Sequence, residues 1–172
     1  MKILITGTQG LAKELELVYS GHEVTTISKS CGYDIIRVAE WGHEFLDYDL
    51  LFNCAYDGLG QVLVLDYFYQ HWFNNPNKTI VTIGSKIISQ PRIEIDRDKE
   101  YWPYREHKQI LQYIHDARWP TAVCDLKIIN PGAFDSVMVK NLNVPKMSLF
   151  DLANKIKTVA GDPLIKRLDL WL

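Results

Sequence analysis

The stretch "YREHK" contains a pair of side chains whose types and spacing suit proton transfer, Tyr104 and Lys108. Residues four apart on a helix share a face, so the Lys108 ammonium group can approach the Tyr104 phenol. A phenol has a reference pKa of about 10, and a nearby positive charge favours its ionised form. Tyr104 is therefore a candidate general acid, with Lys108 beside it. The same spacing also arises by chance, so the motif needs support from elsewhere in the chain.

The first residues, "MKILITGTQGLA", read as a strand that enters a helix through a glycine turn. Gly7 and Gly10 permit positive φ angles and allow the backbone to approach a ligand closely. The free N–H groups at the start of the following helix, together with the helix dipole, suit a pyrophosphate. Ala12 stands where the dinucleotide pattern has its third glycine, and that pattern tolerates alanine. The alternative is an ordinary tight turn between a strand and a helix.

The end of the second expected strand, "ISKS", carries Ser28, Lys29 and Ser30. A dinucleotide site that prefers NAD places a carboxylate here, which would repel a 2′-phosphate. Two hydroxyl groups and one ammonium group suit the phosphate instead, and so favour NADP over NAD. The alternative is a solvated turn that happens to contain a lysine.

Apolar strand-like runs alternate with amphipathic helical runs along the whole chain. Strands are expected at 2–6, 23–28, 49–54, 78–84, 121–129 and 165–171, and helices at 10–19, 35–47, 60–73, 101–118 and 148–160. This alternation predicts an α/β fold in which a parallel sheet is covered by helices on both faces.

Ligands of such sheets bind beyond the carboxyl ends of the strands. The positions to inspect are therefore Thr6-Gly7, Ser28-Lys29, Asn53-Cys54-Ala55, Gly84-Ser85 and Asn130-Pro131-Gly132.

Taken in order, these motifs resemble the short-chain dehydrogenase/reductase superfamily over nearly the whole chain. "TGTQGLA" is similar to the family's glycine motif, "NCA" to its Asn-Asn-Ala motif, and "NPG" to its Pro-Gly motif. The resemblance implies a doubly wound Rossmann fold with a parallel sheet of about seven strands in the order 3-2-1-4-5-6-7. It also implies a single domain, residues 1–172, with the active site built into it. The wide spacing between Ser85 and Tyr104 resembles extended or atypical members, and the chain as a whole resembles a shortened one.

The resemblance also implies roles for individual residues. Ser85 would hold the substrate carbonyl, Tyr104 would transfer the proton, and Lys108 would bind both the phenol and the nicotinamide ribose. The implied cofactor-binding residues are Gly7, Thr8, Gln9, Gly10, Leu11, Ser28, Lys29, Ser30, Asp34, Ile35, Asn53, Cys54, Ala55, Lys108, Pro131, Gly132 and Ser136. Among these, Asp34 and Ile35 would contact the adenine, whereas Pro131, Gly132 and Ser136 would contact the nicotinamide end.

Three features depart from the family pattern. Tyr56 replaces an expected glycine, Asp66 stands at the helix position that often carries a relay asparagine, and the segment after Gly132 is short. Two functions therefore stay open. The first is an NADP-dependent oxidoreductase that acts on a small carbonyl or alcohol by a Ser-Tyr-Lys mechanism. The second is an NAD(P)-binding regulator or scaffold without turnover.

Composition narrows the remaining possibilities. A net charge of −2 without a basic cluster argues against a nucleic-acid partner. No apolar run is long enough to span a membrane, and no signal peptide is expected before "ILITG". The separated residues Cys31, Cys54 and Cys124 fit neither a metal site nor a disulfide framework, which favours the cytoplasm. The aromatic stretch within residues 60–73 predicts a homo-oligomer, either a dimer or a tetramer.

Overall fold

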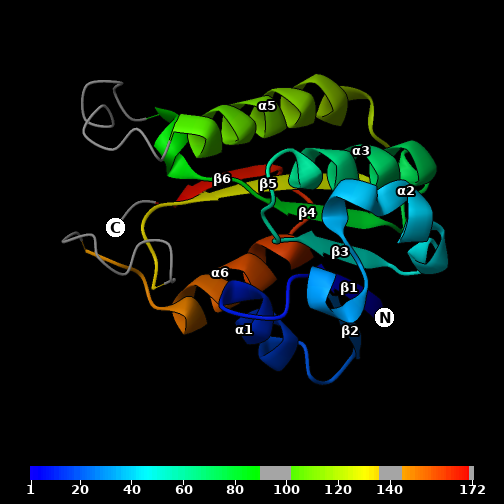
Figure 1. Cartoon of the computed structure of the whole chain (residues 1–172), viewed down its shortest axis with the longest axis horizontal. Coiled ribbons are helices and arrows are strands. Elements are labelled where there is room, and N and C mark those ends of the chain that lie inside the picture. The colour runs from blue at the N-terminus through cyan, green and yellow to red at the C-terminus, as the bar shows by residue number, and fades with distance from the viewer. Residues whose placement is uncertain (90–101, 136–144, 171–172) are drawn as a thin grey trace.

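The computed structural model describes residues 1–89, 102–135 and 145–170. Within them the chain forms a six-stranded, fully parallel sheet in the order β2-β1-β3-β4-β5-β6 (Figure 1). The strands are β1 Lys2–Thr6, β2 Glu23–Ile27, β3 Leu50–Asn53, β4 Thr79–Ile83, β5 Asp125–Pro131 and β6 Arg167–Leu170. The helices are α1 Leu11–Val18, α2 Val38–Trp41, α3 Gly60–Trp72, α5 Trp102–Arg118 and α6 Leu149–Gly161. The predicted doubly wound parallel fold is confirmed.

The observed strand order is the expected one without the outermost strand of the 3-2-1 half. After β2 the chain instead makes short helical turns between residues 29 and 45. The reason is the spacing of Ile35, Val38, Trp41 and Phe45, which recur every three or four residues and are all buried. That period suits a helical ribbon packed against α3 and does not suit a strand.

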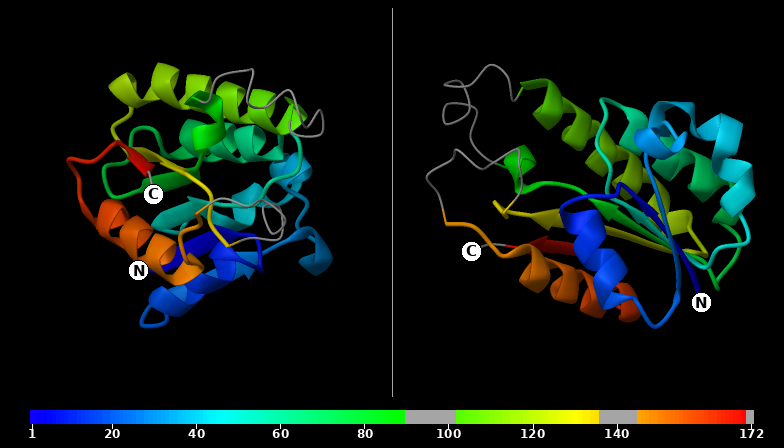
Figure 2. Two further views of the ribbon diagram at one scale, coloured as in Figure 1. Left: turned by 90° about the vertical axis from the view of Figure 1, so that its left-hand side faces the viewer. Right: turned by 60° about the horizontal axis from the view of Figure 1, so that its bottom comes forward.

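Helices α1 and α6 cover one face of the sheet, and α2, α3 and α5 cover the other (Figure 2). Each face has its own hydrophobic core. Two of the four aromatic side chains of α3 are buried: Phe68 contacts both Trp41 and Trp72. Tyr67 and Tyr69 are partly buried against the same core. The aromatic side chains of α3 therefore pack mainly against other residues of the same chain.

Strand β5 begins later than expected, at Asp125, because Trp119–Thr121 form a 3₁₀ turn around Pro120. Its centre contains a fully buried lysine, Lys127. The Lys127 ammonium group donates to the carbonyl oxygens of Val159 and Asp162 and pairs with Asp125. It thus binds carbonyl groups at the C-terminal end of α6, where a positive charge is favourable.

The carboxyl ends of the strands meet at one edge of the sheet and are connected by hydrogen bonds. The Gly7 N–H donates to the Ile27 carbonyl at 2.7 Å, and the Gly84 N–H donates to the Ile129 carbonyl at 2.8 Å. The Thr6 hydroxyl oxygen accepts from the backbone N–H groups of Cys54 and Ala55. These hydrogen bonds fix the strand ends relative to one another at this edge of the sheet.

In the described part of the chain no helix combines the length and apolar character that crossing a membrane requires.

Candidate active site

Lys108 lies in α5 and reaches the edge of the sheet, yet its side chain is buried. Its ammonium nitrogen donates to Gln61 Oε1 at 2.6 Å and to the Ile83 carbonyl oxygen at 2.7 Å. Burial lowers the pKa of Lys108 to about 7, and the nearby Cys54 thiol offsets this only in part. Two hydrogen bonds to neutral acceptors use both protons of an uncharged amine, so the surroundings suit the neutral form of Lys108 as well as the charged one.

Gln61 is the residue that holds Lys108 in place. Its amide nitrogen donates to the carbonyl oxygens of Asn53 and Ile83, at 2.7 and 2.9 Å. The Asn53 side chain returns a hydrogen bond to the Gln61 carbonyl at 2.8 Å. Gln61 therefore connects the ends of β3 and β4 to α5 and fixes the position of the Lys108 nitrogen.

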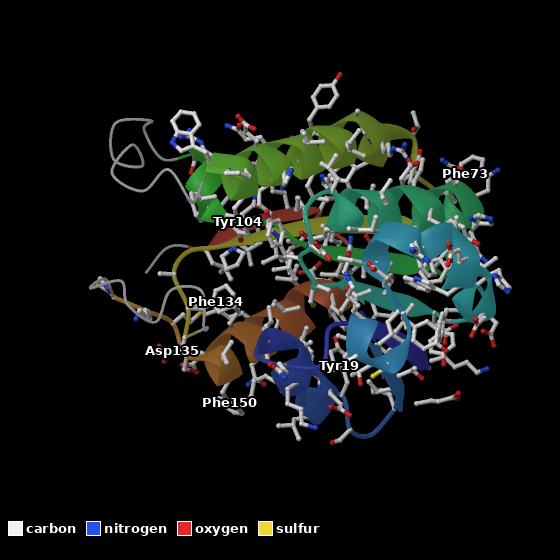
Figure 3. All side chains as sticks on the ribbon, viewed as in Figure 1. Tyr19, Phe73, Tyr104, Phe134, Asp135 and Phe150 are labelled. Carbon is white, nitrogen blue, oxygen red and sulfur yellow. The ribbon has the colours of Figure 1, made fainter. Side chains whose placement is uncertain are left out.

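Tyr104 lies one helical turn before Lys108, at the end of the molecule where Phe134 and Asp135 are also found (Figure 3). The Lys108 nitrogen is 5.4 Å from the centre of the Tyr104 ring. Burial raises the pKa of Tyr104, and a hydrogen bond with the Ser85 side chain lowers it by less. The expected lowering of this pKa by Lys108 is therefore not observed in the protein without cofactor. The phenol is protonated at neutral pH and is in the form that can donate a proton.

Ser85 follows β4 directly, and its backbone is held by a buried amide side chain. Its N–H donates to Asn130 Oδ1 at 3.1 Å. The Asn130 amide nitrogen donates to Gln112 Oε1 at 2.8 Å and to Asp169 Oδ1 at 2.9 Å. The preceding Gly84 leaves room for this amide, because a Cβ there would lie 1.8 Å from Asn130 Oδ1. The position of Ser85 thus depends on contacts from α5, β5 and β6.

Tyr56, at the position of the expected glycine, points toward the same group of residues. Its ring lies 4.8 Å from the Tyr104 ring, in an edge-to-face arrangement. Its hydroxyl is 3.0 Å from Nδ1 of His107, the residue before Lys108 in α5. Ser85, Tyr104 and Lys108 are therefore brought together, with Tyr56 beside them.

The glycine turn fits a pyrophosphate. Gly7 and Gly10 have φ angles of 103° and 56°, which residues with a side chain rarely adopt. A Cβ at Gly7 would lie 3.2 Å from that of Ala12, so the turn packs tightly against α1. No side chain caps the N-terminus of α1, and the space in front of Gly10 is open. Thr8 and Gln9 lie in this turn, whereas Leu11 is buried in the core.

The end of β2 holds Lys29 in an exposed position, as expected, but two carboxylates lie beside it. Lys29 pairs with Asp34 at 3.1 Å and with Asp57 at 3.7 Å. Ser28 and Ser30 hydrogen-bond to each other at 2.8 Å. The ammonium and hydroxyl groups expected around a 2′-phosphate are therefore present, together with negative charge that was not foreseen from the sequence of this turn.

Several other residues that the family resemblance implies as cofactor contacts make hydrogen bonds or packing contacts within the protein itself. Asp34 caps a 3₁₀ turn by accepting from the Ile36 N–H at 3.1 Å. Ile35 is buried against Gly60, and the Asn53 side chain is fully buried. Cys54 and Ala55 contribute backbone N–H groups to the Thr6 hydroxyl.

At the other end of the site, Pro131 ends β5, and the Gly132 N–H donates to the Leu170 carbonyl at 3.0 Å. Ser136 lies outside the described residues.

Asp66 does not lie at a relay position. Its carboxylate pairs with Arg118 and accepts from Gln70, on the part of α3 remote from Lys108. The polar side chain of α3 that contacts Lys108 is Gln61, five residues earlier. Gln61 lies in the first turn of α3, close to the end of β3.

No motif in the sequence assigns a role in the site to Gln61 or His107, and Asn130 is indicated only as one of the strand-end positions. A faint signal exists for Gln61, which is a polar residue next to the apolar run "VLVL". For Asn130 the signal is its place at a strand end. Their partners lie far away in the sequence, so the contacts become visible only in the folded chain.

Solved structures similar to this chain include dehydrogenases, among them proteins described as short-chain dehydrogenases. The 3-alpha-hydroxysteroid dehydrogenase from Pseudomonas sp. B-0831, complexed with NADH, matches with a TM-score of 0.77 and 16% identity over 99% of this chain and 95% of that one. A short chain dehydrogenase from Burkholderia cenocepacia J2315, in complex with NADP, gives 0.75 and 15% over 99% and 88%. A short-chain dehydrogenase/reductase from Vibrio parahaemolyticus gives 0.75 and 15% over 98% of each chain.

No family model matches this sequence, and no curated protein matches it. At these low identities the structural likeness establishes the fold.

Proposed function

We propose that this chain is an NADP-dependent oxidoreductase of the short-chain dehydrogenase/reductase superfamily. In this proposal it reduces the carbonyl group of a small molecule, and residues 1–172 form one nucleotide-binding domain with the active site built in. The observation that carries the proposal is the meeting of Ser85, Tyr104 and Lys108 at the edge of the sheet that also holds the glycine turn. Nucleotide-bound proteins of the same fold support it.

The residues of this chain divide the work as follows. Ser85 donates a hydrogen bond to the substrate carbonyl oxygen, and Tyr104 donates the proton that this oxygen takes up. The bound nicotinamide supplies the hydride. The raised pKa of Tyr104 keeps the phenol protonated at pH 7, which supports reduction over alcohol oxidation at that pH. Lys108 adds positive charge next to the phenol whenever it is protonated.

The cofactor would be held from both ends of the site. The turn from Gly7 to Gly10 offers backbone N–H groups to the pyrophosphate. Lys29 and the hydroxyl groups of Ser28 and Ser30 would contact the 2′-phosphate of NADP(H). Lys108 and the backbone at Pro131 and Gly132 would lie at the nicotinamide end.

One observation favours the second function, an NAD(P)-binding regulator or scaffold without turnover. Lys108 is covered by Tyr56 and already makes two hydrogen bonds. A lysine so engaged has less freedom to meet a ribose.

Two measurements separate the two functions. Titration of NADPH fluorescence should show binding in either case. Consumption of NADPH with a panel of aldehydes and ketones should occur only if the chain is an enzyme. Binding without consumption across the panel would favour the regulator, and absence of binding would contradict both functions.

The proposal includes a homo-oligomer in the cytoplasm. Cys31, Cys54 and Cys124 are all free thiols, which agrees with a reducing compartment. The outer surfaces of α3 and α5 expose Leu63, Ile110 and Tyr113, with Tyr113 72% exposed. These apolar side chains would favour contact with a second copy.

A further inference from the structure

The Lys108 ammonium group is enclosed by two aromatic rings from separate parts of the chain. Tyr56 comes from the loop after β3, and Tyr104 comes from α5. Their ring centres lie 5.8 and 5.4 Å from the Lys108 nitrogen. The two rings also contact each other, with an interplanar angle of 73°. Lys108 is therefore only 3% exposed, although it lies at the edge of the sheet where ligands bind.

The Tyr56 ring is fixed on two sides. One side packs against Tyr104, and the hydroxyl group is hydrogen-bonded to His107 Nδ1 at 3.0 Å. His107 precedes Lys108 in α5, so the same helix carries the enclosed lysine and the residue that holds the ring over it. These two contacts hold the Tyr56 ring in one position beside Lys108.

The groups that face Lys108 come from every element around it. They are the Cys54 thiol and Tyr56 after β3, the Gln61 amide in α3, the Ile83 carbonyl in β4, and Tyr104 in α5 with His107 beside it. Among the described residues, Lys108 forms no ion pair with a carboxylate. Burial is therefore the dominant influence on its charge, and it lowers the Lys108 pKa to about 7.

We propose that Tyr56 is a positioning residue for Lys108. Its ring completes an aromatic cage, formed by Tyr56 and Tyr104, that keeps water from the lysine and so sets whether Lys108 is charged while Tyr104 transfers its proton. The inference rests on the proposed function and extends it to the control of activity by pH.

The cage has two opposing effects on the charge of Lys108. A ring face attracts a cation, which favours the charged form. Exclusion of water disfavours that form, by up to about 3–5 pKa units for a fully buried group. Burial lowers the Lys108 pKa, and we expect this exclusion of water to exceed the attraction by the rings. Removal of the Tyr56 ring should therefore admit water and raise the Lys108 pKa.

The test measures Lys108 directly in the protein without cofactor. The chain is labelled with ¹³C-lysine, and the Cε signal of Lys108, assigned by its loss in Lys108→Arg, is followed from pH 5 to 11. The native protein should titrate near pH 7, and Tyr56→Ala should titrate at least about one pH unit higher. Tyr56→Phe keeps the ring and should stay close to the native value. Tyr113→Ala, an exposed tyrosine on the same helix, is the matched control and should leave the titration unchanged.

An unchanged or lower Lys108 pKa in Tyr56→Ala would overturn the proposal, and so would equal shifts in the Ala and Phe variants. If Tyr56→Ala does not fold, Tyr56→Ser carries the same expectation.

A second experiment measures turnover as a function of pH. The decline of NADPH-dependent reduction with rising pH should move to higher pH in Tyr56→Ala and remain in place in Tyr56→Phe. Failure of the proposed function would appear as absence of turnover in the native protein, whereas the titration of Lys108 needs no substrate.

Discussion

At the scale of the residue, the site depends on two ionisable groups whose pKa values move in opposite directions. Burial lowers the Lys108 pKa to about 7 and raises that of Tyr104. Each shift favours the neutral form of its group, as expected where charge is poorly solvated. The pair therefore contains a protonated phenol and a partly charged lysine at neutral pH. Activity that depends on the charged lysine should fall as pH rises above 7.

The lowered Lys108 pKa predicts a pH-dependent stability. The unfolded chain binds the Lys108 proton up to a pH of about 10.4, whereas the folded chain releases it near pH 7. The unfolded state thus binds more protons above pH 7, and stability should rise with pH in this range. Lys108→Met should remove this contribution, which amounts to roughly 2 kcal/mol between pH 7 and 9. The Cys54 thiol acts in the opposite sense, because its pKa is about 8.5 in the unfolded chain and about 12 in the folded one, so it offsets part of this trend from about pH 8 upward.

Urea unfolding at pH 7 and 9 gives the required free energies. The quantity to compare is the change in the free energy of unfolding between pH 7 and pH 9, in the native protein and in Lys108→Met. The hydrogen bonds lost in Lys108→Met lower its stability equally at both pH values, so they do not affect this change. Lys13→Met, at a lysine on the outside of α1, is the control and should keep the native slope. An unaltered slope in Lys108→Met would show that Lys108 does not titrate in this range.

At the scale of the element, the site consists of strand ends held by side chains from their neighbours. Asn130 in β5 places Ser85 after β4, and Gln61 in α3 places Lys108 in α5. Both amides are buried and make at least three hydrogen bonds, so each can hold only one arrangement without leaving a polar group unsatisfied. A substitution that disturbs these hydrogen bonds should lower turnover even though the substituted residue does not contact a ligand.

Gly84→Ala tests the placement of Ser85. The added Cβ would meet Asn130 Oδ1 at 1.8 Å, so the amide or the strand end must move. Crowding of this kind typically costs about 1–3 kcal/mol, and a displaced Ser85 should lower turnover as well. Gly21→Ala is the matched control, because a Cβ there meets nothing within 4 Å and its φ angle is not positive. Thermal unfolding and NADPH consumption are measured for both variants, and equal behaviour would contradict the role of Asn130.

The ends of β2 and β3 together should set the cofactor preference. Lys29→Asp should weaken NADPH binding and leave NADH binding nearly unchanged. Asp57→Asn should tighten NADPH binding about two- to fivefold, because it removes negative charge from beside Lys29. Asp47→Asn, in a carboxylate that pairs with Lys2, is the control. Fluorescence titration measures both cofactors, and tighter binding of NADH than of NADPH by the native protein would contradict the preference.

At the scale of the whole molecule, the fold followed from the sequence because its signals are local. The strand runs are apolar and short, and the helices repeat their apolar residues every three or four positions. Ser148 also capped α6 as expected, through the Asp151 N–H. The ends of the strands identified the edge at which the candidate residues gather.

The rest of the site could not be predicted because it depends on contacts between distant segments. The partners of Lys108 are Gln61 and Ile83, and the partner of Tyr56 is His107. The spacing of Tyr104 and Lys108 correctly placed both on one helix. It did not reveal the burial that shifts both pKa values, because burial arises from packing of the whole chain.

Assembly is the remaining property at this scale. We expect a homo-oligomer at micromolar concentration, held in part by the exposed apolar side chains of α3 and α5. Sedimentation velocity of the native protein measures its mass, and Tyr113→Glu should weaken the assembly if this surface is used. A monomer across the whole micromolar range would contradict the expectation.

Tyr104→Phe tests whether Tyr104 donates the proton in an NADPH-dependent carbonyl reduction. The ring is kept, so its packing against Tyr56 and Lys108 is preserved while the proton donor is lost. With a substrate that the native protein reduces, we expect kcat to fall by roughly 10²–10⁴-fold, with NADPH affinity nearly unchanged by fluorescence titration. Full activity of Tyr104→Phe on that substrate would show that Tyr104 is not the proton donor.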